Sequence, residues 1–597
     1  MVKEYVMGNS AIALGAIAAG VRLAAGYPGT PSSEIIETMS GRSDGDIYLE
    51  WSVNEKAAME VACAAAYSGA RSMVTMKQMG LNVAADPFMS VAYVGVKGGM
   101  VVVAADDPGP ISSQTEQDTR RFAEFARVPV FDPSSPEEAF EMIRDAFYYS
   151  EKYNTPVLFR PTTRVCHAYA SINTEESFQI KEYEGFVKDS GRWVIFPGLA
   201  NANHEMIEKR NVRIGKDFSS YRFNTVSGAS RKAVIAGGVS CAYAGEFMRD
   251  YPELKLIRVG TPYPFPEDFM LKALEGVDEV LCFEELSPFL EENVLRLAGR
   301  HRLNIRVHGK LDNTTPLSGE NSADIAAAVI GEFYGISTDG GRDLSDRPEL
   351  PVRPPVLCAG CPHRAAFYAV KKAMEGRKTY FCGDIGCYTL GNAMPLDMVD
   401  TCLCMGAGVT MAQGFHRVDD EGTAFAFIGD STFFASGITG AVNAVYNEAD
   451  IILCVLDNST TAMTGHQPHP GTGKNLMGDI APKISIEKIL EGIGLEKIIT
   501  VDPFDFNRAK DAVSECAGEK GVRAIIFRAP CVAISKPAAK CEISRNCINC
   551  RKCIKETGCP ALIVAEGQVA IDSNLCTGCG LCANICPAFA IGGAGNE

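Results

Sequence analysis

Residues 423–458 read TAFAFIGDSTFFASGITGAVNAVYNEADIILCVLDN, and this stretch decides the fold. Two apolar runs, 424–428 and 451–456, flank a segment from Gly437 to Asn447 whose apolar residues recur at helical spacing, which predicts a strand, a crossover helix and a second strand. The runs are continuous rather than alternating, as expected for parallel strands buried on both faces. The sequence therefore predicts a doubly wound α/β sheet that binds its ligand at the carboxyl ends of its strands.

Two polar residues stand where the predicted strands end. Asp430 follows the first strand and Asn458 follows the second, so the topology should bring them together at one edge of the sheet. A carboxylate and an amide oxygen, together with phosphate oxygens and water, suit octahedral Mg²⁺. The alternative is a pair of ordinary strand-to-loop turns, in which Gly-Asp and Asp-Asn are common.

The composition limits the classes of protein to be considered. The chain has 597 residues, of which 46% are hydrophobic and 22% charged, and its 57 basic and 73 acidic residues give a net charge of −16. This length predicts about four domains, and the negative charge argues against nucleic acid as the main partner. No apolar run approaches the ~20 residues of a membrane span, and the N-terminus has no signal-peptide pattern, so we expect a cytoplasmic protein with no membrane association.

The densest cysteine pattern lies at the C-terminus. Nine of the 22 cysteines fall between Cys541 and Cys586, and in a cytoplasmic protein such clustering predicts metal rather than disulfides. The tail contains CxxCxxCxxxCP at 576–587, and CxxCxxC at 547–553 followed by Cys-Pro at 559–560. The first pattern is that of bacterial ferredoxins, in which the fourth cysteine ligates the other cluster. Zinc is the alternative, and the two repeats argue against it.

By this crossed rule the tail is predicted to hold two [4Fe–4S] clusters, which would carry electrons one at a time. One cluster takes Cys547, Cys550, Cys553 and Cys586, and the other takes Cys576, Cys579, Cys582 and Cys559. Five residues separate Cys553 from Cys559, where the ferredoxin pattern has three. Cys541 is left over and is predicted to be free.

Two N-terminal segments carry side chains that suit a ligand site. Thr30, Ser32 and Ser33 are hydroxyl residues beside a predicted helix start, where backbone N–H groups favour an anion, although a plain helix cap is the commoner use of such residues. Glu55 opens an Ala-rich helix, 56–68, where it either answers the helix dipole or presents its carboxylate to a ligand.

Further turns surround the central stretch and are predicted to converge on one end of its sheet. They are Cys361-Pro362-His363, the turn Gly383-Asp384-Ile385-Gly386-Cys387, the Gly-rich turn at Gly406, and a loop with His466 and His469. The CxxC pair at 358–361 could be half of a metal site, but no second CxxC lies nearby and no metal is predicted there. HxxH at 466–469 also suggests metal, but its Pro/Gly-rich setting favours a loop that covers a site.

The predicted architecture is a set of doubly wound parallel-sheet α/β domains followed by a small α+β domain for two clusters. The predicted bounds are 1–180, 181–335, a linker at 336–356, 357–535 and 540–597. Within the second domain, residues 181–230 are expected to be irregular. Glu284 and Glu285 follow the predicted strand 279–283 and are expected in a solvated loop.

Taken in order, the motifs resemble the 2-oxoacid:ferredoxin oxidoreductases, and in particular the branch that oxidises indolepyruvate. The residues that carry the resemblance are GYPGTPSS at 26–33, NEK at 54–56, CPHR at 361–364, GDIGC at 383–387, GDSTFF at 429–434, LDN at 456–458, TAMTGHQPH at 461–469, and the cysteine tail. The resemblance covers nearly the whole chain, and the set in this order is specific although single pieces are not.

The resemblance implies bound thiamine diphosphate with Mg²⁺, and it implies roles for individual residues. Glu55 would contact the N1′ nitrogen of the cofactor, Thr30 would contact the 2-oxo acid, and His363 would contact the cofactor. Further cofactor contacts would be Cys361, Gly383, Asp384, Ile385, Gly386, Cys387, Gly406, Gly429, Ser431 and His466, and the Mg²⁺ ligands would be Asp430, Asn458 and the carbonyl of Thr460. The family often has glycine where this chain has Ser431. Arg120 and Gln114 are the candidates to bind the substrate carboxylate.

The implied reaction is oxidative decarboxylation of aryl 2-oxo acids, such as indolepyruvate and phenylpyruvate, with coenzyme A. The products would be an aryl-acyl-CoA and CO₂, with electrons passing through the clusters to ferredoxin and with a separate small beta subunit in the enzyme. One alternative is the same chemistry on pyruvate or 2-oxoglutarate. Two others are a non-oxidative thiamine-dependent decarboxylase, which has no need of the cysteine tail, and an electron-transfer protein whose α/β domains only support the clusters.

Overall fold

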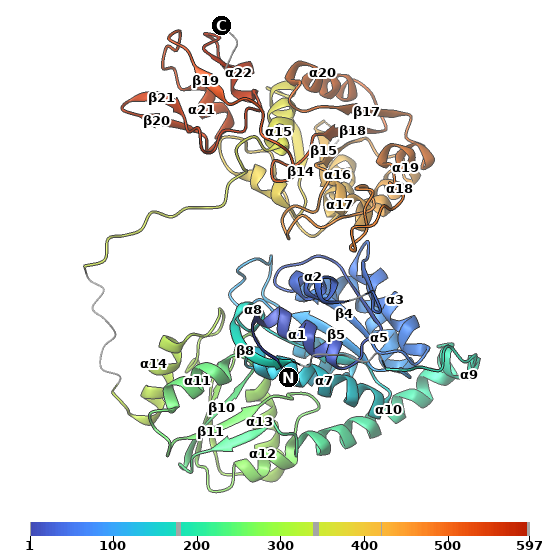
Figure 1. The fold of residues 1–597 in the computed structure, drawn as a ribbon, viewed down its shortest axis with the longest axis vertical. Coiled ribbons are helices and arrows are strands. Elements are labelled where there is room, and N and C mark those ends of the chain that lie inside the picture. The colour runs from blue at the N-terminus through green and yellow to red at the C-terminus, as the bar shows by residue number, and fades with distance from the viewer. Residues whose placement is uncertain (1, 44, 175–180, 338–345, 420, 594–597) are drawn as a thin grey trace. The chain divides into compact units, whose positions relative to one another are not determined.

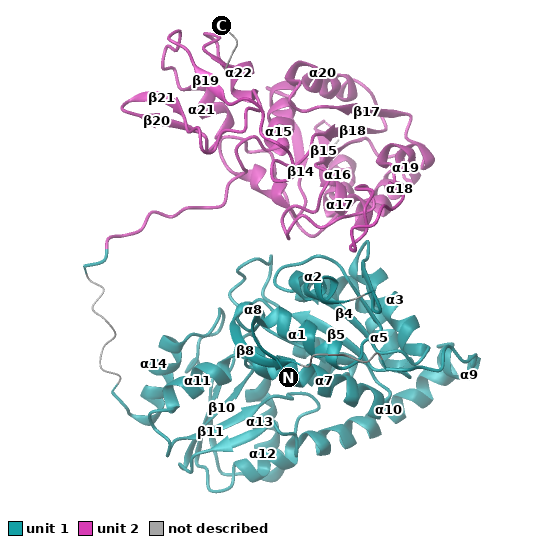
Figure 2. Cartoon of the chain, viewed as in Figure 1, with its two compact units in different colours: residues 1–347 teal, residues 348–597 magenta. Residues whose placement is uncertain are grey.

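The structure, a computed structural model, describes residues 2–43, 45–174, 181–337, 346–419 and 421–593. The chain divides into two compact units, Met1–Arg347 and Pro348–Glu597 (Figure 2). The division falls within the predicted linker 336–356, of which residues 338–345 lie outside the described residues. Each unit is considered by itself below.

The first unit begins with a six-stranded parallel sheet in the order β3-β2-β4-β5-β7-β6 (Figure 1). Its strands are β2 (Leu23–Gly26), β3 (Tyr48–Trp51), β4 (Ser72–Lys77), β5 (Met100–Ala105), β6 (Val130–Phe131) and β7 (Val157–Phe159). Every residue of β5 is buried, as its uninterrupted apolar sequence requires in a sheet covered on both faces.

Helices cover this sheet, and a two-stranded antiparallel sheet lies beside it. The helices are α1 (Gly8–Ala18), α2 (Ser33–Arg42), α3 (Glu55–Tyr67), α4 (Gln78–Val83), α5 (Ala85–Val94), α6 (Thr119–Ala126), α7 (Pro136–Tyr153) and α8 (Thr163–His167), and the small sheet pairs β1 (Val2–Met7) with β8 (Tyr169–Thr174). Asn54 caps α3 by accepting a 2.9 Å hydrogen bond from Ala57 N, which fixes Glu55 in the first turn.

A second sheet of the first unit has the order β13-β12-β10-β11-β9 and is parallel except for its edge strand β9. Its strands are β9 (Thr225–Ser227), β10 (Lys232–Gly237), β11 (Lys255–Val259), β12 (Glu279–Phe283) and β13 (Arg306–His308), with helices α11 (Ser240–Met248), α12 (Glu267–Ala273), α13 (Phe289–His301) and α14 (Ala323–Tyr334). One apolar cluster contains Met76 and Val102 of the first sheet together with Ile257 and Cys282 of the second. The two sheets therefore share a core.

The expectation of irregular structure at 181–230 is wrong. After a short helix, α9 (Ser190–Trp193), the 22-residue helix α10 (Pro197–Phe218) occupies the middle of this range. Its buried apolar residues, Ile207, Ile214 and Phe218, recur at helical spacing. Exposed Met206 and Val212 lie among the polar residues of the helix and blur this stripe in the sequence pattern.

Glu284 and Glu285 are also not in a solvated loop, because both carboxylates are buried. Glu284 accepts hydrogen bonds from Arg120 Nη1 at 2.8 Å and from Leu290 N at 2.9 Å. Glu285 accepts one from Asn321 N at 2.9 Å, and burial raises its pKa to about 7. Arg120 and Asn321 come from distant parts of the chain, so the local sequence did not indicate these contacts.

The second unit contains the sheet predicted from the central stretch, with the parallel order β14-β15-β16-β18-β17. Its strands are β14 (Thr379–Cys382), β15 (Thr423–Gly429), β16 (Ile451–Asp457), β17 (Lys497–Val501) and β18 (Val522–Arg528), with helices α15 (Pro362–Ala373), α16 (Ala407–Val418), α18 (Ile438–Tyr446), α19 (Ile486–Gly492) and α20 (Phe506–Ala517). Helical structure begins at Asp430, with α17 (Asp430–Thr432) and a π-helical turn at Phe433–Gly437, earlier than the predicted start at Gly437.

The cysteine tail forms a small α+β domain in the same unit. It contains two antiparallel two-stranded sheets, β19–β22 and β20–β21, and two short helices, with bounds β19 (Cys541–Ile543), α21 (Lys552–Thr557), β20 (Leu562–Ala565), β21 (Gln568–Ile571), α22 (Leu581–Ile585) and β22 (Ile591–Gly593). Leu581 and Ile585 of this domain are buried in one apolar cluster with Phe367 and Tyr388 of the preceding domain. The prediction of α/β domains followed by an α+β cluster domain is confirmed.

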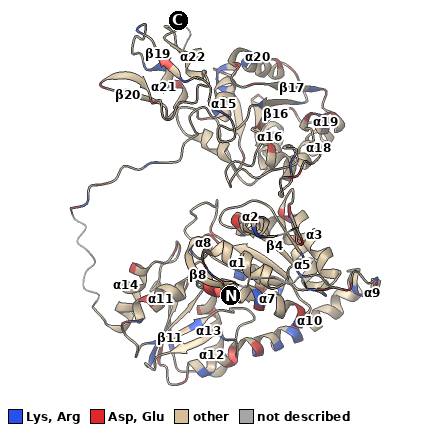
Figure 3. Ribbon diagram, viewed as in Figure 1, with Lys and Arg blue, Asp and Glu red and all other residues tan. Residues whose placement is uncertain are grey.

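Charged residues are distributed without separation of sign. Lys and Arg (blue) and Asp and Glu (red) both occur along the helices of each unit (Figure 3). In the part of the chain that the structure describes, no helix is both long enough and apolar enough to cross a bilayer.

Candidate active site

Asp430 lies at the carboxyl end of β15, where its carboxylate is buried and held by three contacts. Its Oδ1 accepts a hydrogen bond from Ser431 N at 2.9 Å, and its Oδ2 accepts one from Ser459 N at 2.7 Å. The Nε2 atom of His469 lies 3.2 Å from the same Oδ2. Burial raises the pKa of Asp430, whereas the neighbouring imidazole lowers it.

Asn458 lies beside Asp430, as the topology predicted. The strands that precede them are neighbours, with Gly429 opposite Leu456, and the Asp430–Ser459 hydrogen bond joins the two strand ends directly. Asn458 and Thr460 are both buried. A carboxylate, an amide oxygen and the nearby backbone carbonyl of Thr460 are the hard oxygen donors that Mg²⁺ prefers, so these residues fit the ion.

The turn 383–387 is tied to the turn at Gly406 through the buried carboxylate of Asp384. Its Oδ1 accepts hydrogen bonds from Ile385 N at 2.7 Å and from Gly406 N at 2.8 Å, and its Oδ2 accepts one from Tyr388 Oη at 3.1 Å. Burial raises the pKa of Asp384 to about 7, which these hydrogen bonds oppose. Asp384 thus holds two of the predicted cofactor turns together.

The ring of Tyr388 leaves no room for a side chain at two of the predicted cofactor-contacting positions, Gly386 and Gly429. A Cβ atom placed on Gly386 or on Gly429 would come within 2.6 Å of the Tyr388 ring. Gly406 has φ of 83°, a left-handed conformation that favours glycine. Gly386 and Gly429 keep the backbone open around Tyr388, which the sequence did not mark as a site residue because a single tyrosine carries no motif.

His363 is buried at the start of α15, and neither of its ring nitrogens has a hydrogen-bond partner among the described residues. Burial lowers its pKa to about 4, so the ring is neutral at pH 7. The ring packs edge-on against Tyr388, with 5.6 Å between centroids. Buried polar groups are normally paired, so two unpaired nitrogens beside the glycine turns fit a residue that contacts a ligand. Cys361, the N-cap residue of this helix, is buried as well.

In the first unit, Glu55 is buried in the first turn of α3, and its carboxylate packs against Gly80 of α4. A Cβ atom on Gly80 would lie 2.6 Å from Glu55 Oε1, so only glycine leaves room for the carboxylate. Burial raises the pKa of Glu55 to about 7, and the charge of Lys77 lowers it. If Glu55 only stabilised the helix dipole, its carboxylate would be expected to remain solvated. A buried carboxyl group that exchanges its proton near neutral pH suits proton transfer.

The loop at Thr30 lies close to Lys77, a residue that the sequence analysis missed. Ser32 Oγ donates to Gly29 O and Ser33 Oγ accepts from Gly29 N, both at 2.9 Å, so these two hydroxyls shape the loop. Thr30 is half-buried. A Cβ atom on Gly29 would touch the Lys77 side chain at 3.2 Å, and Lys77 also interacts electrostatically with Glu55. A lysine at the end of an otherwise apolar strand was the only signal in the sequence.

Arg120 is not available to bind a substrate carboxylate. Its guanidinium is buried and forms ion pairs with Asp118 at 2.7 Å and with Glu284 at 2.8 Å. Removing it would leave two buried carboxylates uncompensated, which assigns Arg120 a structural role. Gln114 lies exposed on the loop before α6.

The two histidines of the HxxH loop have different environments. His466 is exposed and has φ of 67°, whereas His469 is buried beside Asp430. Gly471 N donates to His469 Nδ1 at 3.1 Å, which leaves the other ring nitrogen, Nε2, on the side of Asp430. The sequence analysis placed a cofactor contact at His466 and did not select His469.

Several tail cysteines that the crossed rule assigns to one cluster lie near one another. One pocket is lined by Cys547, Cys550, Cys553 and Cys586. Cys579 interacts electrostatically with Cys559 and Cys576, and Cys582 with Cys559. Cys541, predicted to be free, forms no disulfide but lies in hydrogen-bonding contact with Cys582. No three His, Cys, Asp or Glu side chains of the described ranges are arranged around a single metal ion.

Four further cysteines come together in the preceding domain. Cys387 interacts electrostatically with Cys358 and Cys531, and Cys358 interacts with Cys361 and Cys531. Cys531 N donates to the carbonyl oxygen of Asn458 at 2.9 Å, so the group adjoins the Asp430–Asn458 edge. The prediction of no metal here rested on the absence of a second CxxC, but the third and fourth cysteines are single and far apart in sequence.

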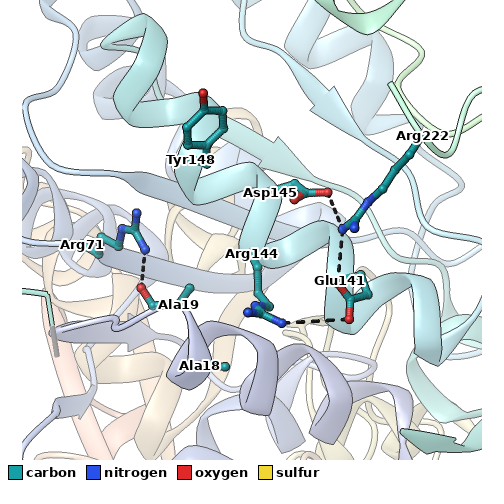
Figure 4. A pocket seen from close by; sticks show the side chains of 8 residues that line it. All are labelled: Ala18, Ala19, Arg71, Glu141, Arg144, Asp145, Tyr148 and Arg222. Atoms are coloured by element: carbon teal, nitrogen blue, oxygen red, sulfur yellow. Dashed lines mark hydrogen bonds and ion pairs between the residues drawn. The ribbon is translucent and has the colours of Figure 1, made fainter. Parts of the chain in front are cut away.

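A separate surface pocket of about 330 Å³ lies in the first unit (Figure 4). Arg222 crosses its rim to Asp145 at 2.8 Å and to Glu141 at 3.2 Å, and Arg71 donates to the carbonyl of Ala19. Its charges are therefore paired with one another, and none of the predicted site residues lines it.

The geometry defines a class of protein, and comparisons with known families agree with it. Residues 14–193 match the family described as pyruvate flavodoxin/ferredoxin oxidoreductase, thiamine diphosphate-binding, and residues 384–527 match the C-terminal TPP-binding domain of thiamine pyrophosphate enzymes. Residues 569–592 match the 4Fe–4S binding domain. The chain is a thiamine diphosphate-dependent oxidoreductase of the 2-oxo acid:ferredoxin type.

Full-length relatives identify the family within this class. The chain is 42% identical over 609 residues to the indolepyruvate oxidoreductase subunit IorA of Methanothermobacter thermautotrophicus, with 99% of this chain and 97% of that protein covered. The corresponding subunits of Archaeoglobus fulgidus and Thermococcus kodakarensis are 39% and 38% identical, with 99% and 98% of this chain and 97% and 96% of those proteins covered. The chain belongs to the family of indolepyruvate oxidoreductase subunits IorA, which confirms the predicted resemblance.

Proposed function

We propose that the chain is the catalytic subunit of an enzyme that oxidatively decarboxylates aryl 2-oxo acids with coenzyme A and passes the electrons to ferredoxin. The observation that carries the proposal is the apolar core that the TPP-binding domain shares with the cysteine tail. A non-oxidative decarboxylase has no use for clusters fixed against its cofactor domain. The names of the relatives support indolepyruvate as substrate and a second subunit as partner.

When bound, thiamine diphosphate would supply stabilisation of the negative charge left after loss of CO₂. Asp430, Asn458 and the carbonyl of Thr460 would hold Mg²⁺ on its diphosphate, with His469 orienting Asp430 through their 3.2 Å contact. Ser431 and the glycine turns 383–387, 406 and 429 would line the cofactor, and Cys361 and His466 would contact it.

Glu55 would exchange a proton with the N1′ nitrogen of the cofactor, for which its pKa of about 7 suits it. Neutral His363 would donate or accept one hydrogen bond at the cofactor without adding charge. Thr30 would donate its hydroxyl to the 2-oxo acid. These roles need side chains that are already fixed, and burial fixes Glu55 and His363.

We further propose that the tail holds two [4Fe–4S] clusters in the crossed arrangement and that Cys358, Cys361, Cys387 and Cys531 hold a third. Thiolates are the ligands that such clusters use. The electrostatic contacts among these four cysteines and the hydrogen bond from Cys531 N to Asn458 O support a site next to the cofactor domain's strand ends.

Anaerobic reduction by substrate tests the proposed function. The chain, co-expressed with its small subunit, is mixed with coenzyme A and one of indolepyruvate, phenylpyruvate, pyruvate or 2-oxoglutarate, and the visible absorbance of the clusters is followed. We expect bleaching with the aryl substrates. Bleaching with only pyruvate or 2-oxoglutarate would support the same reaction on a different substrate. If no 2-oxo acid bleached the clusters in protein that contains iron and thiamine diphosphate, the proposal would be refuted.

The cluster count has its own measurement. Since each cluster contains four iron atoms, three sites predict about twelve iron atoms per chain, and Cys387→Ser is expected to lose about four of them. Cys404→Ser, an exposed cysteine of the same domain, should lose none. About eight iron atoms in both wild-type protein and Cys387→Ser would contradict the third site and leave the two tail clusters.

A further inference from the structure

Arg364 is a buried cation at the junction between the TPP-binding domain and the cysteine tail. It lies in the first turn of α15, and only 4% of the residue is exposed. Its guanidinium donates from Nη1 to the carbonyl of Thr557, in the tail, and from Nη2 to the carbonyl of Leu357, in the preceding domain. The two bonds fix the charge in one place.

A further donor of this guanidinium, its buried Nε–H, has no acceptor among the described residues. Burial lowers the pKa of Arg364, and the neighbouring thiols that oppose this shift are Cys559 and Cys579 of the tail and Cys361 and Cys358 of the preceding domain. A buried, unpaired N–H on a cation whose electrostatic neighbours are thiols suits donation to a thiolate.

Arg364 lies on the side of one of the two predicted tail clusters. The tail cysteines with the largest electrostatic effect on Arg364 are Cys559 and Cys579, which are in the set completed by Cys576 and Cys582. A Cβ atom on Gly558, the residue before Cys559, would lie 3.7 Å from Arg364 Nη1. The junction packs this side of the tail closely, since a Cβ atom on Gly360 would collide with Thr577, the residue after Cys576. The Cys559 set therefore faces the TPP-binding domain.

We propose that Arg364 is a positioning residue that raises the reduction potential of the cluster bound by Cys559, Cys576, Cys579 and Cys582. This cluster would then be the first electron acceptor in the tail. The proposal deepens the proposed function and rests on its assignment of clusters to the tail. Each cluster takes up one electron and becomes more negative by one charge. A fixed cation and an N–H donor both stabilise that reduced form, and both are known means of raising a cluster potential.

The test is a redox titration of the holoenzyme, with its small subunit, using dithionite as reductant and electron paramagnetic resonance to follow each reduced cluster. In Arg364→Gln, which keeps an amide donor but loses the charge, the potential of one tail cluster is expected to fall. The expected fall is at least about 59 mV, a tenfold change in how one electron divides between the two tail clusters. Arg364→Lys, which keeps the charge, is expected to restore most of the potential.

Two further variants assign the shift. Arg551 lines the pocket of the other cysteine set. Any change in reduction potential in Arg551→Gln should therefore affect the cluster of that set and not the cluster near Arg364. Lys371 lies on the same helix as Arg364 but donates to Pro395 O and Leu396 O within its own domain, so Lys371→Met should move neither. Unchanged potentials in Arg364→Gln with full iron content, or equal shifts of both tail clusters, would overturn the proposal.

Iron content and the signal of the second cluster report folding independently of the shift. Should Arg364→Gln lose a cluster, Arg364→Lys still decides, because a potential that falls despite the retained charge would contradict an electrostatic role. Because dithionite supplies the electrons, these outcomes do not depend on which 2-oxo acid is the substrate. Failure of the inference is thereby distinguishable from failure of the proposed function.

Discussion

Replacing Glu55 by glutamine is expected to lower the rate of 2-oxo acid-dependent cluster reduction by a factor of about 10² to 10⁴, the range that a positioned acid–base group contributes. Glutamine has nearly the same size and can occupy the space beside Gly80, but it cannot exchange a proton with the cofactor. The rate is measured by stopped-flow absorbance under anaerobic conditions. Thiamine diphosphate content should stay close to that of the wild-type protein.

The control is Glu60→Gln, five residues further along the same helix. Glu60 is exposed and pairs with Lys56, so this variant removes the same group without touching the buried site. Its rate should match that of the wild-type protein. If Glu55→Gln kept more than a tenth of the wild-type rate, Glu55 would not be the proton-exchanging group.

Glu55→Gln is also expected to make the cofactor-free protein more stable than the wild-type protein at higher pH. The folded-state pKa of Glu55, about 7, lies above its ordinary value of 4.5, so the folded state favours the protonated carboxyl. Wild-type stability is therefore lost as pH rises from about 4.5 to about 7 and stays lower above that range. Because glutamine does not ionise, Glu55→Gln should gain up to about 3 kcal/mol over wild type at pH 8 and gain nothing at pH 4. The thermal unfolding midpoints of the two proteins across this range provide the measurement.

The second large effect is expected from Asp430→Asn. The amide keeps the shape of the carboxylate but loses the charge that would bind Mg²⁺, and its NH₂ group cannot accept the hydrogen bond from Ser459 N. Because even residues that only orient a metal ligand contribute 10- to 100-fold to affinity, loss of a ligand should weaken thiamine diphosphate binding by more than about 100-fold. Calorimetric titration of desalted protein with thiamine diphosphate and Mg²⁺ measures this.

Two comparisons make the Asp430 result specific. His469→Gln, which removes only the group beside Asp430 Oδ2, should weaken binding by about 10- to 100-fold. Asp450→Asn lies at the opposite end of the β16 region, where Asp450 pairs with Lys520 at 2.9 Å, and should leave affinity unchanged. Addition of EDTA should weaken binding to wild type but not further to Asp430→Asn. Equal affinities in Asp430→Asn and wild type would exclude a metal ligand at this position.

The parts of the site that could be predicted from sequence are those fixed by local pattern. Continuous apolar strands ending in Asp430 and Asn458 were sufficient to predict their meeting, because parallel strands place their carboxyl ends on one edge. The spacing of the tail cysteines was likewise sufficient to predict their grouping. In both cases neighbours in space are determined by short-range rules.

The parts that could not be predicted depend on contacts between distant segments. Arg120 was selected as a substrate ligand because its partner Glu284 is 164 positions away. Tyr388 lacks a motif, and the HxxH pattern that contains His469 was assigned to a covering loop. Both residues gain a role only from what the fold packs against them. Cys531 was passed over for the same reason, since the three cysteines that it joins precede it by more than 140 positions.

The core shared by the TPP-binding domain and the cysteine tail has a consequence for engineering. Leu581 and Ile585 are buried in one apolar cluster with Phe367 and Tyr388. The tail is therefore not an independent domain that is only connected by a linker. Cutting it away would uncover apolar surface on both pieces and favour aggregation of each. Replacing the tail with a foreign ferredoxin would require redesign of the α15 surface. Exchanging residues 348–597 as one unit would leave the shared core intact.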